Sequence, residues 1–176
     1  MTSEGRAPRA GGLLSLRRLA LLAIATSGII DITRFLQRPS LWIDEASVAL
    51  NLGRRSFAAL AHPLDWRQLA PVLWLWIEKA VVSVDGMRES TGRLVALIAG
   101  LALPWLVWSS GRRLVGEPAA LVATIFTAAS ATLRFYANET KPYALDAAVA
   151  ALLLLLAARV LERNGDRGSW RALGIG

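Results

Sequence analysis

Three apolar blocks in the second half of the chain constrain its fold more than any other feature. Leu94–Ser110 and Pro118–Leu133 contain no charged side chain, and Tyr143–Ala158 contains only Asp146. An α-helix rises about 1.5 Å per residue, so each block spans roughly 24–26 Å, close to the hydrocarbon thickness of a bilayer. A surface helix of a soluble protein carries a polar stripe, which these blocks do not have. The pattern predicts transmembrane helices.

A shorter apolar block, Leu19–Ile30, lies near the N-terminus and follows two arginines. A basic start before a short apolar stretch is also typical of a cleaved signal peptide, which stays the alternative. The helix can continue through further apolar residues, so we expect a first span over 16–36. In that span Asp31 and Arg34 lie one turn apart, as an (i, i+3) pair near a membrane end.

We therefore expect an all-α polytopic membrane protein with about four transmembrane helices and with juxtamembrane helices in a long first outer loop. The expected boundaries are 16–36 for the first span, 37–92 for the outer loop, then 93–110, 118–134 and 143–161 for three spans, with a possible fifth span starting from 171. We expect such a chain to be the N-terminal part of a larger membrane protein. The composition agrees, with 55% hydrophobic residues and no cysteine. One histidine, His62, makes a Cys- or His-based metal centre improbable.

The basic residues predict the orientation. The net charge is +7, and the basic residues flank the apolar blocks, which leaves no basic surface for a nucleic acid. With the N-terminus in the cytoplasm, Lys and Arg are about twice as dense in the inner segments, 1–18, 111–117 and 159–171, as in the outer segments, 34–93 and 134–142. Cytoplasmic segments of membrane proteins are enriched in these residues. The pattern predicts a multi-pass protein of the cell (inner) membrane with a cytoplasmic N-terminus.

The long outer loop carries most of the candidate chemistry. Trp42-Ile43-Asp44-Glu45 follows a Pro-Ser break and opens a helix-like stretch that ends near Gly53. Acidic residues in a first turn also suit the helix dipole, so this pair has a purely structural alternative. Further along, Val72–Val84 is apolar and contains two tryptophans, but it is too short to span a bilayer. We expect an interfacial helix there, with a further membrane span as the alternative.

The short outer segment, Arg134–Tyr143, is dense in polar and aromatic side chains for a connector. Cations in it could bind a phosphate, because charge-assisted hydrogen bonds to phosphate are strong. The alternative is a solvated turn with two tyrosines at the membrane interface.

Taken in order, these motifs resemble the N-terminal half of membrane glycosyltransferases of the GT-C type. More closely, they resemble the family of protein O-mannosyltransferases, lipid A aminoarabinose transferases and rhizobial lipopolysaccharide glycosyltransferases. The resemblance covers about residues 15–165 and rests on Trp42–Glu45, Gln68–Pro71, Arg93-Leu94, Gly111–Gly116 and Tyr136–Leu145. It implies transfer of a sugar from a polyprenyl-phosphate donor, in the membrane lipid, to an acceptor hydroxyl on the extracytoplasmic face, with no cofactor.

The resemblance also implies roles for single residues. Asp44 becomes the general base, which takes the proton of the acceptor hydroxyl as the new bond forms. The leaving lipid phosphate is an anion that nearby cations stabilise. The implied substrate-binding residues are Lys141, Arg134 and Arg93 for the phosphate, Gln68 for the acceptor, Glu45 and Glu139 for sugar hydroxyls or for positioning Lys141, and Tyr136 and Tyr143 along the path of the lipid phosphate. Relatives often carry Arg in place of Lys141, and Lys lacks the bidentate fork.

Two other functions stay open. A transporter would need ionisable groups along a path inside the membrane, and only Asp31 and Asp146 lie at that depth, near helix ends. A truncated, non-catalytic membrane protein is the second alternative, because four or five helices lack the later part of a donor groove. No metal site is assigned: Asp44 and Glu45 could help to hold a divalent ion, but two adjacent carboxylates alone are a weak site, and metal dependence stays open.

Overall fold

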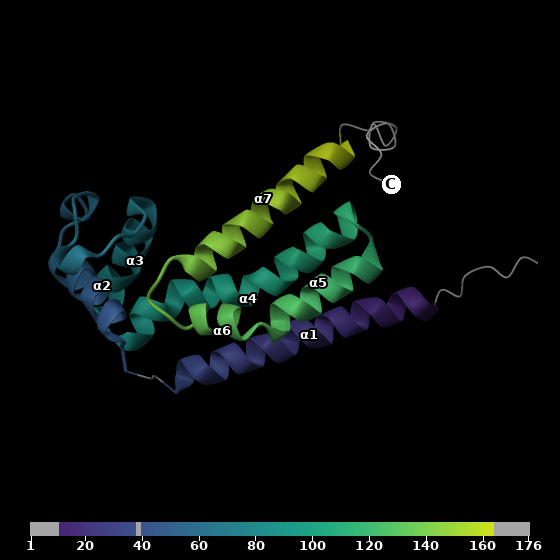
Figure 1. Ribbon diagram of the computed structural model, residues 1–176, viewed down its shortest axis with the longest axis horizontal. Coiled ribbons are helices and arrows are strands. Elements are labelled where there is room, and N and C mark those ends of the chain that lie inside the picture. Colours follow the sequence, from purple (N-terminus) through teal and green to yellow (C-terminus); the bar gives the residue numbers. More distant parts are fainter. Residues whose placement is uncertain (1–10, 38–39, 164–176) are drawn as a thin grey trace, which may run out of the picture.

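The computed structural model describes residues 11–37 and 40–163, and every regular element in that part of the chain is helical (Figure 1). In chain order the elements are α1 (Gly11–Leu36), α2 (Ile43–Arg54), the 3-10 turns η1 (Ala59–Ala61) and η2 (Asp65–Arg67), α3 (Val72–Asp85), α4 (Glu89–Leu114), α5 (Glu117–Ala129), α6 (Ala131–Tyr136) and α7 (Tyr143–Arg163). The expected all-α class is confirmed. The expected start of a fifth span, from 171, lies outside the described residues.

Three of the described helices are long and apolar enough to cross a membrane. They are Leu16–Leu36, Glu89–Leu114 and Tyr143–Glu162, close to three of the four expected spans. The remaining expected span, 118–134, is divided into α5 and α6 at Ser130. The Ser130 backbone is extended, and its hydroxyl accepts a hydrogen bond from the N–H of Leu133 at 3.3 Å, which starts a new helix. The chain is a polytopic membrane protein with one broken helix.

Four helices, α1, α4, α5 and α7, run lengthwise beside one another and form a bundle (Figure 1). The central helix is α4, which contacts the other three. Small residues allow close approach, because a β-carbon placed on Gly100 would lie only 2.4 Å from the β-carbon of Ala137. This contact seats the end of α6 directly on α4. The broken span is therefore held against the middle of the bundle.

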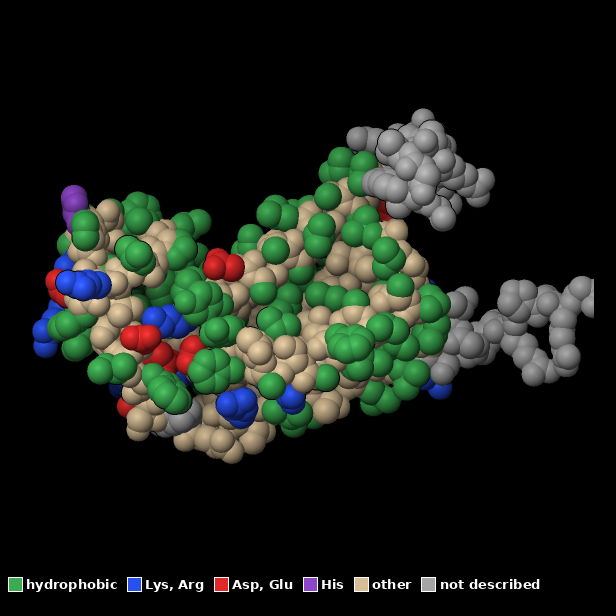
Figure 2. All heavy atoms as spheres, in the orientation of Figure 1, with side chains coloured by type: hydrophobic (Ala, Val, Ile, Leu, Met, Phe, Trp, Pro, Cys, Tyr) green, Lys and Arg blue, Asp and Glu red, His purple; other side chains and the backbone are tan. Residues whose placement is uncertain are grey.

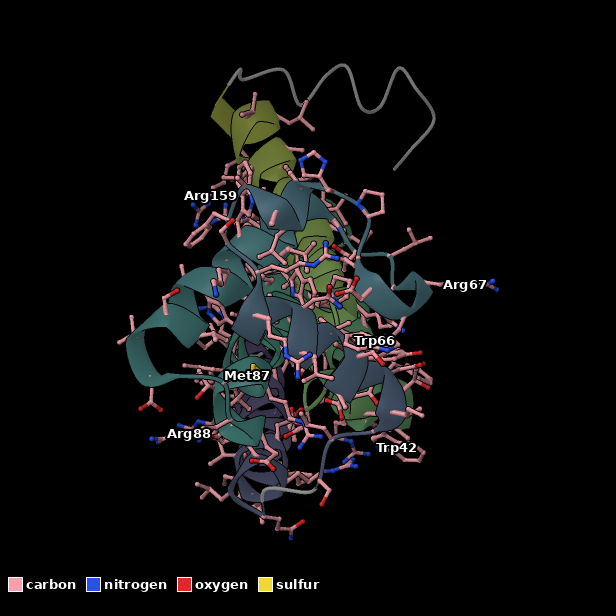
Figure 3. All side chains as sticks on the ribbon, turned by 90° about the vertical axis from the view of Figure 1, so that its left-hand side faces the viewer. Trp42, Trp66, Arg67, Met87, Arg88 and Arg159 are labelled. Carbon is pink, nitrogen blue, oxygen red and sulfur yellow. The ribbon has the colours of Figure 1, made fainter. Side chains whose placement is uncertain are left out.

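A separate helical unit covers one end of the bundle (Figure 1). It consists of α2, η1, η2 and α3, which together we call the cap. Its apolar core is formed by buried residues of the two helices and of η1: Val48, Leu52, Leu60, Trp74 and Leu75. Seen from the cap end, Trp42 and Arg67 lie on one side and Arg88 points away on the other (Figure 3). The juxtamembrane helices expected within 37–92 are present as α2 and α3.

The opposite end of the bundle carries interhelical ion pairs. Arg17 of α1 donates to Glu117 of α5 at 2.8 Å, and Arg113 of α4 pairs with Glu162 of α7. The last turn of α4 adds Arg112 at the same end. This is the end that the distribution of basic residues predicts to be cytoplasmic. The cap and these arginines lie at opposite ends of the bundle.

Candidate functional site

A cavity of about 310 Å³ lies where the cap meets the bundle. We call it the site cavity. Its lining comes from the start of α2, from α6, from the loop 137–142 and from the start of α7: Trp42, Ile43, Asp44, Glu45, Phe135, Tyr136, Glu139, Lys141 and Tyr143. On the face shown in Figure 2, acidic side chains gather at the join between cap and bundle. The structure thus brings the Asp-Glu motif at the start of α2 together with the polar loop 137–142.

At the start of α2 the two neighbouring carboxylates have different surroundings, because Asp44 is exposed and Glu45 is buried. Asp44 lies in the first turn, and its exposed side chain lines the site cavity. Glu45 turns inward, where its Oε2 accepts the N–H of Trp42 at 3.1 Å. That bond satisfies a backbone donor at the helix start, as in a capping box. Asp44 is therefore accessible to a ligand, while Glu45 is engaged by the protein.

Glu45 and Arg93 form a buried ion pair beneath the cavity. Their side chains are 1% and 3% exposed, and the guanidinium donates to both carboxylate oxygens, at 3.0 and 2.6 Å. The N–H of Thr140 adds a bond of 2.7 Å to Oε1. Burial alone would raise the pKa of Glu45, but the hydrogen bonds from Arg93, Thr140 and Trp42 outweigh it and lower that pKa. One ionised carboxylate therefore joins α2, α4 and the loop 137–142.

This pairing changes how two predicted site residues are understood. We expected Arg93 to stabilise a phosphate and Glu45 to hold sugar hydroxyls or to position Lys141. In the structure the two charges are directed at each other, and Arg93 also donates to the carbonyl of Ser40 at 3.3 Å. Both side chains are buried, so the geometry gives them a supporting role in holding the cavity walls together.

Lys141 is the cation among the described residues that line the site cavity. Its Nζ donates to Oε1 of Gln68 at 3.3 Å. Gln68 follows the turn η2, in which Trp66 and Arg67 have φ angles of 56° and 55°. Non-glycine residues rarely adopt this left-handed backbone, and it costs free energy. The turn therefore directs Gln68 toward Lys141, beside the cavity rather than into its lining.

Two side chains hold the η2 turn: Asn51 of α2, and Arg55 at the C-terminal end of that helix. Arg55 donates to Oδ1 of Asp65 at 2.8 Å and to the carbonyl of Pro63 at 2.8 Å. The buried Asn51 accepts the N–H of Asp65 at 3.1 Å. The helix that presents Asp44 thus also fixes the turn that leads to Gln68.

Glu139 lies in the loop 137–142 and also lines the cavity. Burial raises the pKa of Glu139, and the negative charges of Glu45 and Asp44 raise it further, against the opposing charges of Lys141 and Arg93. A carboxyl of this kind takes up a proton more readily than an exposed one. It can donate or accept a hydrogen bond to a hydroxyl-bearing ligand.

An aromatic wall closes one side of the site cavity. The rings of Tyr136 and Tyr143 meet edge to face with centroids 4.7 Å apart, and Phe135 and Tyr136 meet in the same way at 5.5 Å. Such contacts are favourable for aromatic pairs and fix the rings relative to one another. Carboxylates, one cation and a rigid apolar wall together suit a ligand with hydroxyls, an anionic group and an apolar part.

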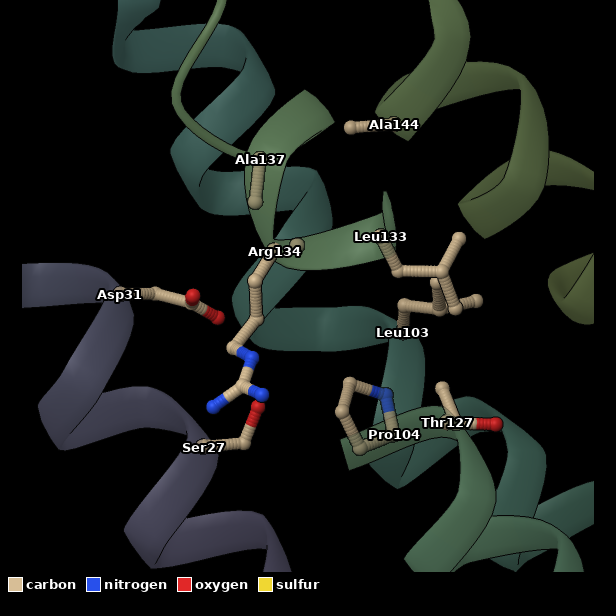
Figure 4. Close-up of a pocket in the computed structure, with 10 residues that line it drawn as sticks. Ser27, Asp31, Leu103, Pro104, Thr127, Leu133, Arg134, Ala137 and Ala144 are labelled. Carbon is tan, nitrogen blue, oxygen red and sulfur yellow. The ribbon is translucent and has the colours of Figure 1, made fainter. Parts of the chain in front are cut away.

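The structure places Arg134 away from the site cavity. Its side chain runs toward α1 and lines a narrow second cavity of about 10 Å³ with Ser27 and Asp31 (Figure 4). The prediction that Arg134 joins Lys141 on a phosphate is not supported by this geometry. Within the short helix α6, Arg134 faces α1 while the next two residues face the site cavity.

Some contributors to the site have no signal in the sequence. Thr140 takes part through its backbone N–H, which no side-chain pattern marks. Phe135 and Ile43 line the cavity as apolar residues next to predicted polar ones. Among the described residues, no group of three or more His, Asp or Glu side chains is placed to hold a metal ion.

Comparison with known proteins finds a family. The family model of dolichyl-phosphate-mannose-protein mannosyltransferases matches residues 69–176. No curated protein and no solved structure matches the chain. The matched range includes α3 to α7 and the loop that carries Glu139 and Lys141, whereas Asp44 and Glu45 precede it.

Proposed function

Because the chain belongs to the dolichyl-phosphate-mannose-protein mannosyltransferase family, we propose that it moves a sugar from a polyprenyl-phosphate donor to an acceptor hydroxyl on the extracytoplasmic membrane face. Membership in the family makes it a membrane glycosyltransferase of the GT-C type. The observation that carries the finer proposal is the site cavity, in which an exposed Asp44 and a cationic Lys141 line the same space. A base and a cation are the two charges that this reaction requires.

The proposed reaction is a displacement at the anomeric carbon of the sugar. The acceptor oxygen forms a bond to that carbon, and the bond from the carbon to the phosphate oxygen breaks. Asp44 takes the acceptor proton, because a hydroxyl is a poor nucleophile until its proton is removed. The lipid phosphate leaves as an anion, and Lys141 stabilises the charge that develops on it. Attack opposite to the leaving group inverts the anomeric centre.

The remaining predicted residues bind or position. Glu139 hydrogen-bonds a sugar hydroxyl, and the aromatic wall of Tyr136 and Tyr143 covers the apolar part of the donor. Gln68 holds the Lys141 ammonium through the 3.3 Å bond. Support for these roles comes from the shared cavity and from the distances that link its walls.

We also propose that the cap faces the outside of the cell membrane and that the arginine-rich end faces the cytoplasm. Because the chain has no cysteine, single cysteines report the orientation directly. Ser56→Cys lies exposed in the cap, and Val115→Cys lies exposed at the opposite end. In intact cells a membrane-impermeant maleimide should label the first and not the second. Labelling of only Val115→Cys would invert the proposed orientation.

The test of the reaction is transfer of labelled sugar from a polyprenyl-phosphate donor pool in membranes that contain the protein. Asp44→Asn should reduce the rate by about 100-fold or more, as expected when a general base is lost. The matched control is Glu89→Gln, an exposed acid in the first turn of α4 outside the site cavity. Full activity of Asp44→Asn alongside normal insertion would remove the base assignment.

A further inference from the structure

The break between α5 and α6 leaves backbone carbonyls without helical donors. The last carbonyls of any helix lack intrahelical partners, and apolar surroundings offer no water to replace them. In this structure Nη2 of Arg134 donates to the carbonyl of Ala129, the last residue of α5, at 2.9 Å. A cation at the end of a helix also suits its dipole. Arg134 therefore belongs to the break itself.

The side chain of Arg134 lies in the same narrow cavity as an acid of the first helix (Figure 4). Asp31 of α1 is 2% exposed, and its Oδ1 has no hydrogen-bond partner within the part of the chain that the structure describes. It faces the narrow cavity that Arg134 and Ser27 also line (Figure 4). Among the described residues that line this cavity, Arg134 is the cation. A buried acid in a membrane helix needs such a counter-charge.

Contacts toward α1 and toward α4 hold α6 in place. On one side Arg134 reaches α1. On another, Ala137 sits on Gly100 of α4, so closely that no side chain fits there. The residues between them, Phe135 and Tyr136, line the site cavity. Leu133 and Tyr136 of α6 also pack against the apolar core formed by α4 and α7.

We propose that Asp31 and Arg134 form a charge lock that sets the rotation of α6 and thereby holds the aromatic wall in the site cavity. Asp31 is a positioning residue, because it acts through Arg134 and does not line the site cavity. The effect on sugar transfer rests on the proposed function. The placement of α6 does not.

The placement is tested without activity, in the cysteine-free chain. Phe135→Cys is labelled with a water-soluble maleimide, and the melting temperature is measured in detergent. Asp31→Asn and Arg134→Gln should each change the labelling rate and lower the melting temperature, and the double variant should do no more than the worse single one. Arg34→Gln is the matched control, since it removes the other nearby cation, and it should change neither. Additive effects for Asp31→Asn with Arg134→Gln, or coupling with Arg34→Gln instead, would overturn the lock.

Activity provides the second readout. Asp31→Asn should lower kcat/KM for transfer by up to about 100-fold, the cost of misplacing a wall by roughly 1 Å. The reversed pair, Asp31→Arg with Arg134→Asp, should recover part of that loss and restore the labelling rate. Asp31→Glu keeps the charge and should keep the labelling rate, which preserves the test if the neutral variant does not insert.

The two proposals fail in different ways. Coupled labelling with no sugar transfer by any version of the protein would leave the lock standing and remove the proposed function. Normal transfer and unchanged labelling in Asp31→Asn would leave the function standing and remove the lock.

Discussion

Removing Arg93 tests whether a buried ion pair holds the site together. In Arg93→Met the Glu45 carboxylate loses two hydrogen bonds, of 3.0 and 2.6 Å, and keeps those from the N–H groups of Trp42 and Thr140. The carboxylate stays buried with its charge uncompensated, since it is 1% exposed. Breaking a buried pair by removing one partner costs about 3–5 kcal/mol. At about 2–4 °C per kcal/mol for a chain of this size, we expect a melting temperature lower by roughly 6–20 °C.

A surface pair provides the matched control. Arg88 donates to Asp85 at 3.3 Å, but the two side chains are 65% and 59% exposed, and Arg88 points away from the cap (Figure 3). Exposed pairs contribute at most about 1 kcal/mol, so Arg88→Met should shift the melting temperature by no more than roughly 4 °C. Thermal melts followed by helical circular dichroism in the same detergent compare the two variants.

The pH dependence of stability tests the same ion pair. The lowered pKa of Glu45 stabilises the native protein above its ordinary pKa of 4.5, and this contribution is lost as the pH falls through the lower native value. Arg93→Met lacks that contribution. The difference in melting temperature between wild type and Arg93→Met should therefore become smaller as the pH falls below about 4.5. If Arg93→Met melted within the range of Arg88→Met at neutral pH, the pair would not carry the stability we assign to it.

Two further predictions concern the cap and the bundle. Burial raises the pKa of Glu78 to about 8, so the stability that is complete below its ordinary value of 4.5 is lost as the pH rises through about 8. Glu78→Gln should therefore flatten the pH dependence of stability between about pH 4.5 and 8, by roughly 1.4 kcal/mol per pH unit at the steepest, and an unchanged slope of melting temperature against pH would contradict the burial argument. Gly100→Ala should lower the melting temperature, because its β-carbon would come 2.4 Å from that of Ala137, whereas Gly53→Ala meets only an ordinary contact of 3.7 Å and serves as the control. Equal melting temperatures for the two alanine variants would contradict the close approach.

The helices could be predicted because their signals are local. Length, apolar composition and flanking arginines are properties of short windows, and they placed α1, α4 and α7 close to their observed bounds. The break at Ser130 could not be predicted in this way. Its neighbours are apolar, and what stabilises the break is the bond from Arg134 to Ala129 and the seating of Ala137 on α4.

The candidate site could also be predicted only in part from the sequence. The local motifs indicated which residues are chemically capable, and the site cavity gathers most of them. They did not show that Glu45 would face Arg93, 48 positions away, because an ion pair between distant segments leaves no pattern in either. For the same reason the (i, i+3) spacing suggested Arg34 as the partner of Asp31, whereas the cavity that Asp31 lines is shared with Arg134 of α6 (Figure 4).

The bond from the N–H of Thr140 to Glu45 joins positions 95 residues apart, which sets an order of events during synthesis. At about 5–20 residues per second, the ribosome adds Thr140 roughly 5–20 s after Glu45. For most of that interval the nascent chain already carries the carboxylate of Asp44 but none of the wall formed by α6 and the loop 137–142. The cavity is thus completed only when the last helices of the bundle arrive. A nascent chain stalled before the loop 137–142 would carry the acid without the cavity in which it acts.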